Sequence, residues 1–240
     1  MYRSFRYARL GLHILRGLLL TAALIPFLPE HRQTRIRQQW SRGMLEVLGI
    51  HLDVNEPYLH PGSLLVANHV SWVDVFVINA CSPVAFVAKA DIRDWPIFGW
   101  LARHHGTVFI RRESRRHARA IYQEIGLLLE AGKHVALFPE GTTTDGRELG
   151  NFHGALLQAA VETGAPVQPL AVSYRTPAGQ LTTAPAYAGD TTLLESLRAI
   201  LAEPRLIARV RIQPALSPRD YADRKQLTEA TRAAVAAGLA

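Results

Sequence analysis

The chain has 240 residues, 48% of them hydrophobic, and its 27 Lys and Arg against 20 Asp and Glu give a net charge of +7. This length suits a folded chain with a sizeable core, and the basic balance favours anionic partners, which include acidic lipid as well as nucleic acid. The single cysteine, Cys81, excludes an internal disulfide and a thiolate zinc site.

Residues 1–48 predict a membrane-associating helical segment that precedes a domain at residues 49–240. The apolar stretch from Gly17 to Leu28 is shorter than the roughly 20 residues that a helix needs to cross a bilayer. No small-residue cleavage site follows it, so we expect a retained anchor rather than a signal peptide. Basic residues stand on both sides of the stretch: Arg3, Arg6, Arg9, Arg16, Arg32, Arg35, Arg37 and Arg42. Such flanking charge is typical of the cytoplasmic face of a membrane that contains anionic lipids.

Two helices are expected in this segment. The first, near residues 5–28, would dip into the membrane or lie along it. The second, at residues 30–48, is amphipathic, with Ile36, Trp40, Leu45 and Leu48 on its apolar side. The alternative is a pair of helices that packs on the following domain.

Strand and helix signals alternate through the rest of the chain. Short apolar runs predict strands near residues 50–55, 63–67, 84–88, 107–110, 134–138, 167–174 and 206–213, with helices between most of them and a closing helix at 218–239. This alternation is typical of an α/β fold with a largely parallel sheet flanked by helices.

The first motif follows the apolar run at residues 64–67. Asn68 and His69 would lie just past the carboxyl end of that strand, where open α/β sheets place their ligands. His69 and Asp74 are five residues apart and could not share one helix face, so the chain must turn between them. Ser71 is predicted as a helix N-cap, with Asp74 at the third helical position and pointing back toward His69.

A His and Asp pair of this kind has a definite chemistry. A neutral imidazole, with an ordinary pKa of about 6.5, accepts a hydroxyl proton at physiological pH, and the carboxylate fixes its tautomer. His69 and Asp74 are therefore candidates for a general-base pair that activates an alcohol toward a thioester. The alternative is that Asp74 only caps a helix and His69 only satisfies a buried backbone group.

The second motif stands beyond another predicted strand. Residues 135–138 form an apolar run that Pro139 ends, and Glu140, Gly141 and Thr142 follow. Hydroxyls and exposed backbone amides at this position are suited to an anion or a polar headgroup, and Glu140 to orienting a donor group or an arginine. The two motifs thus occupy equivalent places in the predicted sheet.

In order along the chain, four blocks resemble the 1-acylglycerol-3-phosphate O-acyltransferase family. They are N-H-x4-D at 68–74, the glycine-led F-I-x-R block at 106–112, F-P-E-G-T at 138–142 and a proline-containing apolar strand at 165–172. The resemblance implies that residues 49–240 are the catalytic domain, that His69 is the general base and that Asp74 is its partner. It also implies that the acceptor is bound by Asn68, Arg111, Arg112, Glu140, Gly141 and Thr142.

The activity that the resemblance implies is transfer of a fatty acyl group from acyl-CoA or acyl carrier protein to a lysophospholipid, foremost lysophosphatidate to phosphatidate. The thioester is the co-substrate, and neither a cofactor nor a metal is expected. Arg111 replaces the usual acidic or amide residue, and Phe152-His153-Gly154-Ala155 lacks the usual Lys. These departures keep a lyso-ornithine lipid open as the acceptor.

A rival hypothesis is a non-catalytic basic protein that binds membranes or nucleic acid. It would leave His69 and Asp74 dispensable. The basic residues form no stripe interleaved with aromatic residues, so no nucleic-acid partner is expected.

Overall fold

The computed structural model describes residues 2–55, 59–104, 106–110 and 115–240. Within these ranges one sheet has the strand order β1-β7-β6-β2-β5-β3-β4. Its strands are β1 (Ile50–Val54), β2 (Leu64–Ala67), β3 (Val84–Lys89), β4 (Val108–Ile110), β5 (His134–Leu137), β6 (Val167–Arg175) and β7 (Leu206–Ile212). Each predicted strand is therefore present.

Parallel pairing dominates the sheet. β6, β2, β5, β3 and β4 all run in one direction, whereas β7 pairs antiparallel with β6 and parallel with β1. The predicted α/β fold with a largely parallel sheet is confirmed. β2 lies between β6 and β5, so the residues that follow β2 emerge in the middle of the sheet edge.

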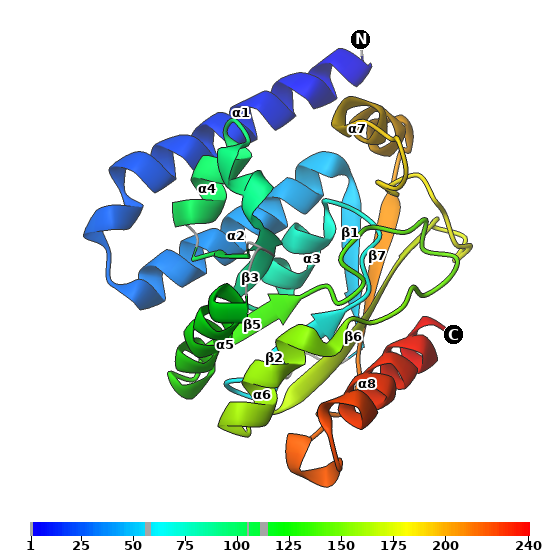
Figure 1. Cartoon of the computed structure of the whole chain (residues 1–240). Coiled ribbons are helices and arrows are strands. Elements are labelled where there is room, and N and C mark those ends of the chain that lie inside the picture. Colours follow the sequence, from blue (N-terminus) through cyan, green and yellow to red (C-terminus); the bar gives the residue numbers. More distant parts are fainter. Residues whose placement is uncertain (1, 56–58, 105, 111–114) are drawn as a thin grey trace.

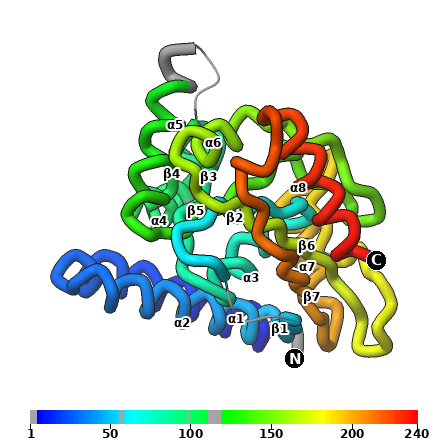
Figure 2. The backbone as a smooth tube through the Cα atoms, turned by 90° about the horizontal axis from the view of Figure 1, so that it is seen from below, coloured from blue at the N-terminus to red at the C-terminus, as the bar shows by residue number. Residues whose placement is uncertain are grey.

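Helices cover both faces of the sheet (Figures 1 and 2). One face carries α1 (Tyr2–Ala23), α2 (Glu30–Leu48), α3 (Asp74–Cys81), α4 (Phe98–His104) and α7 (Leu193–Ala202). The opposite face carries α5 (Arg115–Glu130), α6 (Gln158–Thr163) and α8 (Arg224–Leu239). The predicted closing helix thus starts later than expected, after a short 3-10 turn at Pro218–Asp220.

Two hydrophobic clusters fill the space between helices and sheet. Along β2, Leu65 and Ala67 belong to the cluster under α2 and α3, while Leu64 and Val66 belong to the cluster under α5 and α6. All four side chains are buried. This burial on both faces explains why β2 reads as a continuous apolar run rather than an alternating one.

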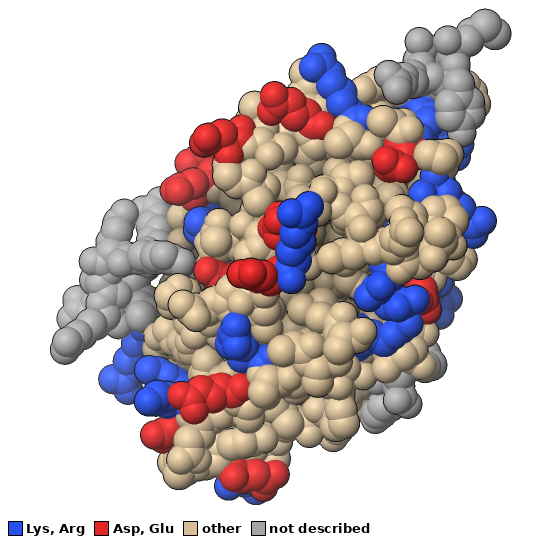
Figure 3. Space-filling view, turned by 90° about the vertical axis from the view of Figure 1, so that its right-hand side faces the viewer, with Lys and Arg blue, Asp and Glu red and all other residues tan. Residues whose placement is uncertain are grey.

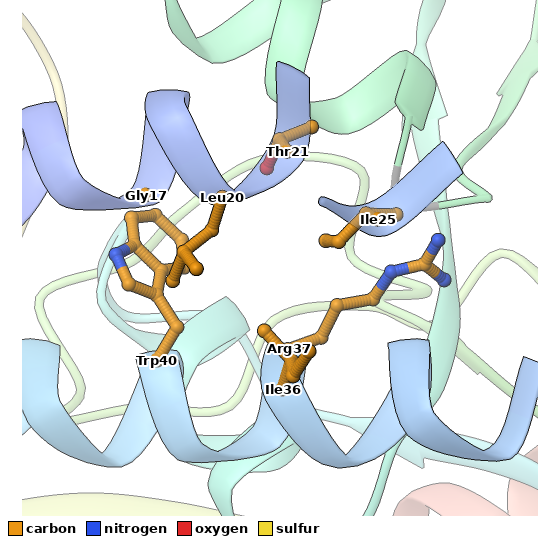
Figure 4. Close-up of a pocket in the computed structure, with 7 residues that line it drawn as sticks. All are labelled: Gly17, Leu20, Thr21, Ile25, Ile36, Arg37 and Trp40. Atoms are coloured by element: carbon orange, nitrogen blue, oxygen red, sulfur yellow. The ribbon is translucent and has the colours of Figure 1, made fainter. Parts of the chain in front are cut away.

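The two amino-terminal helices are present as expected, joined by a 3-10 turn at Ile25–Phe27. The apolar side of α2 faces the protein, because Trp40, Leu45 and Leu48 are buried in the cluster that also contains α3 and β1 residues. Ile36 lines a small pocket between α1 and α2 (Figure 4). For α2, the structure therefore favours packing on the following domain.

α1 lies across α2 at close range. A Cβ on Gly17 would stand 2.5 Å from the Trp40 ring, so only a glycine permits this approach. The two helices also exchange hydrogen bonds: Trp40 Nε1 donates to the carbonyl of His13 at 3.1 Å, and the His13 ring Nε2 lies 2.9 Å from the carbonyl of Trp40. One side of α1 is thereby fixed to the protein.

Candidate active site

The two motifs meet at the carboxyl end of β2 and β5. These strands pair in parallel, with Leu64 opposite Val135 and Val66 opposite Leu137, so both chains leave the sheet at the same edge. There the backbone N–H of His69 donates to Glu140 Oε1 at 2.8 Å. Segments 71 residues apart in the sequence are thus joined by a direct hydrogen bond.

His69 and Asp74 face one another across a tight turn. His69 Nδ1 lies 2.8 Å from Asp74 Oδ2, and that oxygen also accepts the backbone N–H groups of Val70 and Ser71. Because the Asp74 carboxylate only accepts, the imidazole donates from Nδ1, and Nε2 is left with its lone pair. The side chain of His69 is 20% exposed and that of Asp74 is fully buried.

The turn between them differs from the expected helix start. The predicted N-cap at Ser71 is wrong, because α3 begins at Asp74 with Val73 in the cap position. Ser71 Oγ accepts the N–H of Val73 at 3.2 Å, and Asp74 reaches back to the N–H of Ser71. Because the segment is bent, Asp74 Oδ2 can accept hydrogen bonds both from His69 Nδ1 and from the backbone N–H groups of the turn.

The imidazole ring of His69 is held on one face by Phe138. The two rings stack with centroids 3.8 Å apart and planes 9° from parallel. The carbonyl of His69 accepts the N–H of Thr144 at 2.8 Å, which ties the same residue to the loop after β5. Ring and main chain are both held, while part of the ring remains open to solvent.

Glu140 connects the loop after β2 with the loop after β5. The residue is 6% exposed, and the second oxygen of its carboxylate accepts the N–H of Gly150 at 2.8 Å. Burial raises the pKa of Glu140, and the two donated N–H groups offset part of this rise. Next to it, Gly141 has a φ of 70°, and the side chain of Thr142 is exposed. The predicted substrate contacts of these residues remain predictions.

Asn68 extends the pairing of β2 with β6 by one step. Its Nδ2 donates to the carbonyl of Val172 at 2.9 Å and its Oδ1 accepts the N–H of Val172 at 2.8 Å. Both polar groups of this buried side chain are therefore bound to backbone, and its contact with substrate remains a prediction.

Arg111 and Arg112 lie outside the described residues. Among the residues that are described, no group of three or more His, Cys, Asp or Glu is placed to hold a metal.

Tyr174 is a member of this site that the sequence motifs do not identify. Its hydroxyl donates to Asp74 Oδ1 at 2.6 Å from the strand β6. The available signal was a tyrosine near the end of a predicted buried strand, because a buried tyrosine hydroxyl usually has a hydrogen-bond partner. Nothing in the local sequence identifies that partner as Asp74, 100 residues away.

Comparisons with known proteins identify the family to which this chain belongs. Residues 50–173 match the family model described as Acyltransferase. The chain is 37% identical over 223 residues to "Lyso-ornithine lipid O-acyltransferase" of Pseudomonas aeruginosa, covering 91% of this chain and 85% of the relative. It is 38% identical over 214 residues to "1-acyl-sn-glycerol-3-phosphate acyltransferase" of Neisseria meningitidis, covering 87% and 83%.

A solved structure has the same fold. The 1-acyl-sn-glycerophosphate (LPA) acyltransferase PlsC of Thermotoga maritima matches with a TM-score of 0.69 at 20% identity, over 98% of this chain and 96% of that one. The family model covers about half of the chain, including β2, β5 and both motifs, and curated relatives align over most of both lengths. The protein is accordingly an enzyme of the acyltransferase family.

Proposed function

We propose that this acyltransferase moves a fatty acyl group from an acyl-CoA or acyl carrier protein thioester to the free hydroxyl of a lysophospholipid, foremost 1-acyl-glycerol-3-phosphate, giving phosphatidate. The observation that carries the proposal is the hydrogen-bonded pair of His69 and Asp74 at the sheet edge. Two curated relatives of similar identity, named above, act by their names on lyso-lipids, which supports this class of acceptor.

In the proposed reaction His69 is the general base. Its Nε2 accepts the proton of the acceptor hydroxyl while the hydroxyl oxygen attacks the thioester carbonyl. A C–O bond forms, the C–S bond breaks, and the proton passes from His69 to the departing sulfur. Asp74 stabilises the imidazolium that exists between these two proton transfers. No protein nucleophile and no metal take part.

The acceptor's anionic group would be bound beside this pair. Arg111 and Arg112 are suited to it, because guanidinium groups match phosphate oxygens in pairs. Gly141 and Thr142 follow β5 at the same edge and would approach the glycerol part. Asn68 and Glu140 would support the site through the backbone. Asn68 binds the backbone of Val172, and Glu140 binds the N–H groups of His69 and Gly150.

Lyso-ornithine lipid is the second candidate acceptor. It also offers a free hydroxyl together with an anionic group, and the relative from Pseudomonas aeruginosa carries that name at 37% identity. The chemistry at His69 would be the same. A non-catalytic nucleic-acid-binding role is less well supported: on the face formed by α7, α8 and their loops, basic and acidic residues intermix rather than form a basic stripe (Figure 3).

Acyl transfer by purified wild type and His69→Ala tests the proposal, with both acceptors and both thioesters offered in parallel. His60→Ala is a matched control, because His60 is exposed and precedes β2, whereas His69 follows the same strand. We expect product from wild type and His60→Ala and none from His69→Ala. Equal activity in all three proteins would overturn the base assignment, and the preferred acceptor decides between the two lyso-lipids.

The outward side of α1 is the proposed contact with the membrane. Phe5–Phe27 is long and apolar enough to cross a bilayer by length and composition. Leu12, Leu15 and Leu19 are exposed on α1 and line a shallow apolar groove. Because the other side of α1 is fixed to α2, we expect the helix to enter one leaflet without crossing it, at a cytoplasmic surface rich in anionic lipid.

Flotation with liposomes tests this contact. We expect the double substitution Leu15→Glu and Leu19→Glu to abolish flotation, whereas Leu127→Glu, at an even more exposed leucine of α5, should leave it intact. Flotation of wild type should increase with the fraction of phosphatidylglycerol and decrease with salt. Unchanged flotation of the double variant would place the membrane contact elsewhere.

A further inference from the structure

Tyr174 contacts the catalytic pair from a position that the proposed mechanism does not use. Its side chain is 1% exposed, and its hydroxyl donates to Asp74 Oδ1. The other Asp74 oxygen holds the Nδ1 of His69 and two backbone N–H groups. The two oxygens of the carboxylate therefore accept from different donors, and the Tyr174 hydroxyl is the donor to Oδ1.

Backbone contacts of β6 determine the position of the Tyr174 hydroxyl. Asn68, the residue before His69, binds the backbone of Val172 through both its amide groups. Val172 and Tyr174 are two apart on β6, so their side chains point to the same face of the sheet, and both belong to the cluster under α3. Asn68 thus holds β6, which carries Tyr174, next to the end of β2 that His69 follows.

The Tyr174 hydroxyl is a neutral donor to the buried carboxylate of Asp74. A fully buried carboxylate remains ionised only when donors replace its water. Burial and the nearby Asp74 charge raise the pKa of Tyr174 well above its ordinary value, so the phenol stays protonated. Tyr174 can therefore donate a hydrogen bond to Asp74 throughout the working pH range, and it is no source of protons for the reaction.

We propose that Tyr174 is a positioning residue that acts through Asp74. Its hydrogen bond stabilises the carboxylate and holds it rotated so that Oδ2 faces His69 Nδ1. This inference rests on the proposed role of His69 as the base. Tyr174 touches neither acceptor nor thioester in this scheme, so its removal should alter the chemical step and leave acceptor binding unchanged.

Steady-state kinetics of Tyr174→Phe across pH test the proposal. We expect kcat to fall about tenfold, as the loss of one hydrogen bond to a charged group implies, with an unchanged KM for the acceptor. Without the phenol the negative charge on Asp74 is less stabilised and favours the imidazolium of His69. The acid limb of the pH–rate profile should therefore move to higher pH. Glu140, the other ionisable group bonded to His69, is the same in both proteins.

Tyr221→Phe is the matched control, because it removes a tyrosine hydroxyl at the cluster on the opposite face of the sheet. It should leave kcat and the acid limb as in wild type, and thermal unfolding of both variants monitors folding. Wild-type kinetics in Tyr174→Phe would overturn the proposal. So would a fall in kcat with an unmoved acid limb, or a rise in KM alone. His69→Ala separates the two hypotheses: an active His69→Ala defeats the base assignment, whereas an inactive one with a wild-type-like Tyr174→Phe defeats only the role of Tyr174.

Discussion

The carboxylate of Glu140 accepts the backbone N–H of His69 at 2.8 Å, so a side chain of the second motif holds the main chain of the first. Its other oxygen accepts the N–H of Gly150 at the same distance. Glu140 therefore joins three segments of chain near the imidazole, and the five predictions that follow concern this arrangement and the scaffold around it.

Glu140→Gln should lower kcat about tenfold while the protein stays folded. An amide offers one acceptor oxygen and one NH2 group, so the N–H of either His69 or Gly150 loses its partner. Acyl transfer at saturating acceptor measures the effect. Glu148→Gln is the control, because Glu148 is exposed on the same loop and should tolerate the same change. Equal kcat in the two variants would contradict the proposed function of the Glu140 hydrogen bonds.

The raised pKa of Glu140 predicts how its contribution to stability depends on pH. The folded protein binds the Glu140 proton more readily than the unfolded chain, where the pKa is about 4.3. This contribution is fully present below the unfolded pKa and is lost as pH rises through the folded value. The free energy of unfolding of wild type relative to Glu140→Gln should therefore decrease from pH 4 to pH 8. Urea unfolding at several pH values measures it, and a constant difference would refute the expectation.

Gly150→Ala should impair catalysis through Glu140. A Cβ at this position would stand 2.5 Å from Glu140 Oε2, so either the loop or the carboxylate must move. We expect a lower kcat with little change in the KM for the acceptor. Gly11→Ala provides the control, since no atom lies within 4 Å of a Cβ placed there. Should Gly150→Ala keep the kcat of Gly11→Ala, the loop has more freedom than these contacts imply.

Arg6→Met should destabilise the fold by about 2 kcal/mol, since it removes a charged donor from buried carbonyls. The Arg6 guanidinium is buried and donates to the carbonyls of Leu48, Leu201 and Glu203, at the ends of α2 and α7. Chemical unfolding in detergent gives the value. Arg9→Met, at an exposed position of the same helix, should change stability by a few tenths of a kcal/mol at most. Equal stabilities of the two variants would mean that these carbonyls find other donors.

Cys81 should be unreactive in the folded protein. Burial raises the pKa of its thiol to about 12, against the opposing effect of Arg42, and its Sγ donates to the carbonyl of Val77 at 3.3 Å. Because the thiolate is the reacting form, almost none is available at pH 8. Reaction with a disulfide reagent should be slow in the native enzyme and fast in urea. Fast labelling without denaturant would show that the end of α3 opens readily.

Much of this architecture can be predicted from residues that act locally. The apolar run at Leu64–Ala67 predicts a buried strand, and the parallel order of such strands brings Asn68, His69 and Glu140 to one edge. The partners of Asp74 and Glu140 are less predictable. Tyr174 and Gly150 reach them only through the pairing of β6 and the path of a loop, which depend on the whole sheet.

The amino-terminal helices show a second limit. An apolar helix side is equally suited to lipid and to a protein core, so the pattern of Trp40, Leu45 and Leu48 does not distinguish the two. The packing against α3 shows that this side of α2 faces the protein core, because these residues share one cluster with Val77 and Ile78. The helix start predicted at Ser71 also comes too early: residues 72 and 73 form a turn, and Asp74, the first residue of α3, faces Nδ1 of His69.

The stacking of α1 on α2 and of α2 on α3 has a mechanical consequence. Asn79 of α3 donates to Ser41 of α2 at 2.7 Å, Trp40 of α2 bonds α1, and Asp74 is the first residue of α3. A lipid layer that takes up the outward side of α1 would hold the imidazole of His69 at a set height and tilt above the bilayer surface. The acceptor would then rise a fixed distance out of the leaflet to react, and the enzyme would need no hinge to reach it.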